Sequence, residues 1–259
     1  MDMKLQIVAI LMATLAPSAH AQGTTTNPQQ PRIAQDDRDM SAWMRETVDK
    51  HLAENEQRGT RHLSNEELLD IVSLKDYSAP AEVKKKIANG IQSRSLGPLE
   101  VAEGTIPSAS TLASSIHTRI RSDAELKEKL SYAPADLSRS PIGAAELLST
   151  EPTGAISNGK STGLVRTYRI PGSGILVLTE DDYVASQTRI TLIRETLNSS
   201  VNGTPARAYS ARSKDGKGKV ELRWVTPHRS YWLTFITDDH TKIEFGEKLL
   251  KQVAQSISI

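Results

Sequence analysis

The sequence contains no cysteine and few aromatic residues: of its 259 residues, only 4% are Phe, Trp or Tyr. Without cysteine the chain has no disulfide, no thiol nucleophile, no cysteine-built zinc site and no lipidated cysteine. An excess of one charge is also missing, because the net charge is +1 with 24% charged residues. This balance argues against a nucleic-acid-binding protein. The length suits one or two domains.

Long hydrophobic runs are missing as well. Lys4 precedes the apolar stretch 5–16, which is shorter than the roughly 20 residues that cross a bilayer. Ala19-His20-Ala21 then matches an A-x-A cleavage pattern. We therefore predict a signal peptide over 1–21, cleavage after Ala21, and a periplasmic protein with no membrane span.

The rest of the sequence divides into four parts. Residues 22–37 are polar and aperiodic, which predicts a disordered tether. Residues 38–150 predict a region of short helices, and residues 151–163, rich in Gly, Ser and Thr, predict a linker. Residues 164–259 predict an antiparallel β-meander sheet packed against a C-terminal helix. The predicted fold class is therefore α+β.

The predicted helices follow apolar residues at helical spacing, with capping-box patterns at Ser64 and Ser122. They lie near residues 40–52, 64–72, 83–91, 112–120, 122–130 and 142–148, with a loop over 95–110. The predicted strands are 164–170, 175–180, 189–197, 205–212, 219–226 and 230–237, followed by an amphipathic helix from Thr241. Asn202-Gly203 and Asp215-Gly216 are the strongest hairpin signals.

Two of these turns fix a predicted strand register. A two-residue turn at Asp215-Gly216 places Tyr209 opposite Leu222, and a four-residue loop over 226–229 places Val225 opposite Ser230. Side chains alternate along strands, so one face becomes the apolar core beneath the C-terminal helix: Tyr209, Val220, Leu222, Trp224, Tyr231, Leu233 and Phe235. The other face carries Ala208, Ser210, Glu221, Arg223, Trp232 and Thr234.

This second face supplies the candidate binding residues, which are Arg223, Trp232 and Glu221. The register places Arg223 opposite Trp232, with Glu221 alongside. One interpretation is a self-satisfied cation–π pair worth about 0.5–1 kcal/mol. Another is a face buried by the helical region. The third is an exposed docking patch, because Trp and Arg are favoured interface anchors.

The segment 154–163, GAISNGKSTG, fits three catalytic formulas at once. It matches the phosphate-binding loop G-x-x-x-x-G-K-S, the G-x-S-x-G of serine hydrolases, and the S-x-x-K of penicillin-recognising enzymes. The first two require a strand before the segment and a helix after it, whereas a strand pattern follows here. No Lys-Thr-Gly follows to support the third formula. We interpret the segment as a linker and predict no catalytic residue.

Metal and cofactor sites are not indicated either. No two histidines have the H-E-x-x-H spacing, and Asp238-Asp239-His240 has the composition of a helix cap. The run Lys84-Lys85-Lys86 lies between apolar helix positions and predicts a solvated face.

The sequence thus favours an exported, non-enzymatic binding or interaction protein with an envelope protein as partner, such as a partner-docking or effector-neutralising module. One alternative is an envelope hydrolase using Ser157 or Ser161. The other is a carrier of a small apolar or anionic ligand held between sheet and helices.

Overall fold

The computed structural model describes residues 42–257, apart from 44, 48, 51–52, 55–56, 58, 60 and 117–118. The predicted signal peptide 1–21 and tether 22–37 lie outside the described residues, as does much of the predicted helix 40–52.

Helices and two short strands come before the long strands in the chain: α2 (Asn65–Leu68), β1 (Leu69–Val72), α3 (Ala81–Ser95), β2 (Leu99–Val101), α4 (Ala109–Ser115) and α5 (Asp123–Lys129). The following strands are β3 (Glu146–Ser157), β4 (Lys160–Ile170), β5 (Gly174–Asp181), β6 (Ile190–Ile193), β7 (Ser199–Val201), β8 (Thr204–Ser213), β9 (Gly218–Val225) and β10 (Ser230–Thr237). The 3-10 turns η1 (Arg194–Thr196) and η2 (His240–Lys242) follow β6 and precede α6 (Ile243–Ser256).

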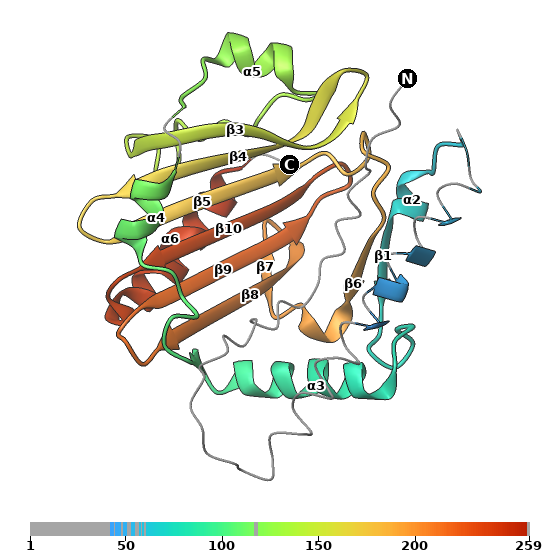
Figure 1. The fold of residues 1–259 in the computed structure, drawn as a ribbon, viewed down its shortest axis with the longest axis horizontal. Helices are drawn as coiled ribbons and strands as arrows, with labels where there is room; N and C mark the ends of the chain where they lie inside the picture. Colours follow the sequence, from blue (N-terminus) through green and yellow to red (C-terminus); the bar gives the residue numbers. More distant parts are fainter. Residues whose placement is uncertain are drawn as a thin grey trace.

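The main sheet has the strand order β2-β8-β9-β10-β5-β4-β3, with β7 paired to β8 (Figure 1). All of its neighbours are antiparallel except β2 and β8. A second sheet joins β1 and β6 in parallel. The α+β class, with a largely antiparallel sheet and a C-terminal helix, is therefore confirmed. Among the described residues, no helix has the length and apolar character needed to traverse a bilayer.

Helix α6 covers one face of the sheet, behind the strands in Figure 1. Its buried residues Leu249, Leu250 and Val253 join a core that the strands supply with Val220, Leu222, Trp224, Tyr231, Leu233 and Phe235. Alternation along β9 and β10 directs these strand residues to one side. The predicted apolar face is thus confirmed for every member except Tyr209.

The segments before β3 pack on the opposite face, mainly toward its two ends. At one end Ile106 and Ala109, at the start of α4, contact Ile175 and Ile236 of the central strands. At the other end Leu63 and Leu68 pack with Tyr183, Ile190, Leu192 and Val225. Between these clusters lies a row of polar and charged side chains.

The position of Tyr209 is a correction with a clear cause. Gly216 has φ +86°, and the amide of Ser213 donates to the carbonyl of Lys217, so the loop after β8 has three residues. A type I turn followed by a left-handed glycine has this form. The extra residue shifts the register by one, so Tyr209 lies opposite Glu221, and Ala208 lies opposite Leu222. Tyr209 therefore moves to the polar face, whereas Ala208 and Ser210 leave it. The β9–β10 register, with Val225 opposite Ser230, is as predicted.

Several predicted helices are shorter than expected or do not form. The capping box at Ser64 is present, but its helix ends at Leu68 and the chain continues as β1. Residues 142–148, predicted as a helix, form a turn and the start of β3. β-Branched residues at 71 and 72 suit a strand once a partner is available, and β6 provides one.

Two further corrections concern the sheet. The predicted strand 189–197 keeps only four residues, and it leaves the meander to pair with β1. Residues 151–163, predicted as a linker, form the β3–β4 hairpin. Asn158 and Gly159 turn this hairpin with φ of +50° and +77°, which is type I′ chemistry.

Candidate binding site

The polar face is built from side chains that lie opposite one another on three neighbouring strands. Arg207 on β8 is paired with Arg223 on β9, which is paired with Trp232 on β10. The next row along the strands is Tyr209, Glu221 and Thr234. Directly opposed side chains have Cβ atoms about 4.5–5.5 Å apart in antiparallel sheets. Two arginines are thus held next to each other by the backbone register.

The three predicted binding residues are in contact. The Arg223 guanidinium carbon lies 3.6 Å from the Trp232 ring centroid, and Arg223 Nη2 donates to Glu221 Oε2 at 2.8 Å. Lys219 Nζ lies 2.5 Å from the other Glu221 oxygen. Arg223 and Glu221 are too buried to be presented as a docking patch, because they are 6% and 3% exposed. Trp232 is half-buried.

Arg207 and Arg94 enlarge this site, and sequence reasoning missed both. Within the described part of the chain, no hydrogen bond or ion pair is formed by the Arg207 guanidinium. Burial and the neighbouring charges of Arg94 and Arg223 lower the pKa of Arg207 to about 10. Burial also lowers the pKa of Arg94, which projects from the last turn of α3. The predicted register hid Arg207, because alternation from Tyr209 sets Arg207 on the apolar side in that register.

Two buried donors in this cluster have no partner among the described residues. They are Arg94 Nε and Trp232 Nε1. A buried N–H without an acceptor costs about 1–3 kcal/mol. The polar face therefore combines neighbouring guanidiniums with donors that lack acceptors.

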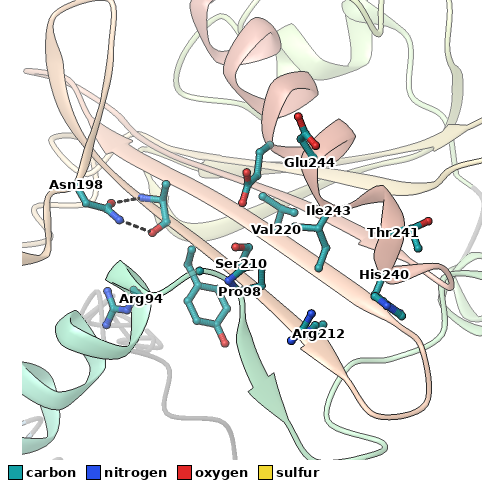
Figure 2. A pocket seen from close by; sticks show the side chains of 14 residues that line it. Arg94, Pro98, Asn198, Ser210, Arg212, Val220, His240, Thr241, Ile243 and Glu244 are labelled. Atoms are coloured by element: carbon teal, nitrogen blue, oxygen red, sulfur yellow. Dashed lines mark hydrogen bonds between the residues drawn. The ribbon is translucent and has the colours of Figure 1, made fainter.

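A groove of about 530 Å³ lies at the stretch of β8 between its pairings with β7 and β2 (Figure 2). The end of α3 contributes Arg94, and the start of α6 contributes Glu244 and Glu247. Arg94 and Tyr209 line the groove, and the charges of both side chains affect the pKa of Arg207. The groove therefore adjoins the arginine cluster.

Asn198 completes the edge of the sheet beside the groove. Its side-chain amide accepts from the Ala208 N–H at 2.8 Å and donates to the Ala208 carbonyl at 3.2 Å (Figure 2). A neighbouring strand would make the same two bonds. Beyond it β2 pairs with β8 from Ala211 onward.

The residues considered as metal ligands serve as caps. Asp238 accepts from the amides of Ala109 and Ser110 at the start of α4, and Asp239 accepts from the Thr241 amide. No group of three or more metal-binding side chains occurs within the described ranges. His51 and His117 lie outside them.

The candidate serines flank a hairpin turn. Ser157 ends β3 and Ser161 lies near the start of β4. Neither hydroxyl takes part in a hydrogen bond in the described structure. A strand, not a helix, follows the segment 154–163, so the backbone geometry of the phosphate-binding and hydrolase formulas is not formed.

A second charged cluster lies on the α6 side of the sheet. Arg166 and the fully buried Glu180 form an ion pair at 2.5 Å, and Glu180 also accepts from the Ala135 amide at 2.9 Å. Arg166 donates to the Ala135 carbonyl at 2.8 Å. These bonds hold the segment after α5 against the sheet, which is a structural role.

Comparison with protein-family models, with curated proteins and with solved structures found no match for the chain.

Proposed function

We propose that this chain is an exported, non-enzymatic binding protein that holds its ligand or partner on the polar face of the main sheet. The observation that carries the proposal is the pairing of Arg207 with Arg223 beside Arg94. Like charges directly opposed on a sheet destabilise it. A bound anionic group that offsets the two positive charges would explain why both arginines occupy these positions.

The side chains at this face suit binding better than bond cleavage. Guanidinium groups stay protonated at neutral pH and form paired hydrogen bonds to oxyanions. They are therefore suited to binding anions and not to transferring protons. Trp232, stacked on Arg223, adds an apolar surface of the kind that anchors interfaces. A hydrolase using Ser157 or Ser161 lacks comparable support, since no base is hydrogen-bonded to either hydroxyl in the described structure.

A small-ligand carrier is the second candidate, and the groove beside β8 favours it. Its volume of about 530 Å³ falls within the roughly 300–1,000 Å³ of small-molecule sites. Native mass spectrometry of the chain purified from envelope extract without denaturation tests this candidate. A bound molecule supports it, and a spectrum of the bare protein contradicts it.

The partner-binding proposal is tested by photo-crosslinking in cells. A photo-crosslinking amino acid is placed at position 232 on the half-buried Trp, and in a control protein at position 245, the exposed Phe of α6. We expect a defined adduct from position 232 that is missing from position 245. Equal adducts from both positions, or labelling of Ser157 or Ser161 by an active-serine probe, would contradict the proposal.

Export is part of the proposal and is supported by the sequence of residues 1–21. Sequencing the N-terminus of the mature protein tests it. A chain beginning at Gln22 in the periplasmic fraction is expected, and one retaining Met1 in the cytosol would contradict export.

A further inference from the structure

We propose that Arg207, which lies opposite Arg223 on the polar face, binds one oxyanion, a carboxylate or phosphate group, together with Arg94, which lines the neighbouring groove at β8. A small ligand carries this oxyanion, and the rest of the ligand lies in the groove. This inference rests on the proposed binding function and adds the chemical class that is recognised.

The positive charges of the cluster outnumber the carboxylates beside them. Glu221 is the carboxylate among these rows, and it already pairs with both Arg223 and Lys219. Arg207 and Arg94 are left without a carboxylate partner within the described structure. Both residues are partly buried, and a charge withdrawn from water is more stable when it is paired. A bound anion would supply the missing charge.

The cluster also holds hydrogen-bond donors that lack an acceptor. An oxyanion accepts several hydrogen bonds, and a guanidinium offers donors in a planar fork that matches carboxylate and phosphate oxygens. Arg94 Nε and Trp232 Nε1 are buried and unpartnered among the described residues. Trp232 stacks against Arg223, so its N–H belongs to the same cluster. Donors and positive charge therefore occur together.

A ligand would approach the cluster through the groove at β8. Arg94 and Tyr209 line the groove, whereas Arg207 and Arg223 are not among its lining residues. Tyr209 lies two residues along β8 from Arg207 on the same face of the sheet, so a ligand in the groove would reach Arg207 past Tyr209. Glu244 of α6 (Figure 2) lines the groove, as does Glu247 of the same helix. These carboxylates repel an anion and attract hydroxyl or amino groups. The ligand is thus expected to place its anionic end at Arg94 and a polar, uncharged or cationic part beside α6.

Isothermal titration calorimetry of the full chain tests the inference with two probes, inorganic phosphate and succinate, at an ionic strength held constant with sodium chloride. We expect saturable binding of at least one probe. Arg207→Gln should weaken that binding at least ten-fold. The control Arg169→Gln removes an exposed arginine of β4 that pairs with Glu146, and it should leave binding unchanged.

The outcomes separate this inference from the proposed function. Binding of phosphate alone or succinate alone supports the oxyanion site and identifies the group. No saturable binding of either probe, or equal affinity in Arg207→Gln, overturns it, even if position 232 still crosslinks a partner. Circular dichroism in chloride checks that Arg207→Gln folds. Should it not fold, Arg94→Gln on α3 replaces it, with the same ten-fold loss expected.

Discussion

Arg207 illustrates how a single side chain links stability to binding. In the folded state, burial and two neighbouring guanidiniums lower the pKa of Arg207 to about 10, so the fold disfavours its charge. This unfavourable contribution is fully present below pH 10, and it fades as the pH rises from about 10 toward the ordinary pKa of about 12.5. A residue that destabilises the protein without ligand is a candidate for a residue retained for function.

Arg207→Gln should therefore stabilise the chain in phosphate-free buffer at pH 7.5. Removing the opposed charge is expected to raise the free energy of unfolding by about 1–3 kcal/mol. Urea unfolding followed by circular dichroism measures the change, and exposed Arg169→Gln should stay within about 0.5 kcal/mol of wild type. A loss of stability in Arg207→Gln would show that its charge is already compensated.

Asp181, the last residue of β5, gives a prediction for the pH dependence of stability. Burial raises the pKa of Asp181 to about 6, although the hydrogen bond from the Thr162 hydroxyl at 3.0 Å lowers it. The native state then binds a proton more tightly than the unfolded chain, so stability falls as the pH rises from about 4 to about 6.

Asp181→Asn keeps an acceptor for Thr162 and removes the charge. It should raise the free energy of unfolding by about 1–3 kcal/mol at pH 7.5, with the gain fading toward pH 4. Unfolding curves at the two pH values measure this. Asp215 is the control of opposite sign, because hydrogen bonds from Lys217 and Ser213 lower its pKa to about 2. Asp215→Asn should destabilise at pH 7.5, and a parallel response of the two variants would refute the assignment.

At the scale of elements, the close approach of α6 to the sheet is the contact that orients the two faces. A Cβ added at Gly246 would lie 2.5 Å from the Phe235 ring. Gly90 in α3 offers a contrast, because its added Cβ would meet only the flexible end of Arg94 at 3.1 Å.

Alanine substitutions at these two helix positions should have opposite effects. Alanine is favoured over glycine in helices by about 0.5–1 kcal/mol, so Gly90→Ala should stabilise by roughly that amount. Gly246→Ala should destabilise by about 1–3 kcal/mol, because the core must move to admit the methyl group. Thermal unfolding of both variants is the measurement. Stabilisation by Gly246→Ala would mean that α6 does not pack as closely as described.

The elements also show how far the sequence predicts this structure. Local chemistry predicted the capping boxes at Ser64 and Ser122, the Asn202-Gly203 turn and the pairing of β9 with β10. It failed where partners distant in sequence decide, as when β6 recruits residues 69–72 into a strand.

For the candidate site, the sequence predicted the contact of Arg223 with Trp232 and with Glu221. It missed Arg207 because two-residue and three-residue loops share the Asp-Gly signal, and one residue reverses every side chain of β8. Arg94 lies far from β8 in the sequence, so no local pattern could place it beside Tyr209.

At the scale of the whole molecule, the Arg166–Glu180 pair ties the segment after α5 to the sheet. Burial raises the pKa of Tyr132, whose hydroxyl lies 3.4 Å from the Glu180 carbonyl, so the phenol stays neutral there. Arg166 and Glu180 lie on the neighbouring strands β4 and β5, and both also bond to the backbone of Ala135. Loss of the pair should therefore affect the sheet and the segment packed on it together.

Glu180→Gln should lower the free energy of unfolding by about 3–5 kcal/mol, because it leaves the buried Arg166 charge uncompensated. Denaturant unfolding measures the change. The control Glu146→Gln breaks the exposed pair with Arg169 and should change stability by less than about 1 kcal/mol. Similar losses in both variants would contradict a special role for the buried pair.

Our central claim is that the sheet face opposite α6 provides a cationic site for an anionic group. A crystal of the full chain, grown without phosphate or sulfate and soaked in selenate, tests that claim directly, because selenium can be located by its anomalous scattering. We expect an anomalous peak for a selenate whose oxygens lie within hydrogen-bonding distance of the Arg207 guanidinium. A soaked crystal with no peak there would contradict it.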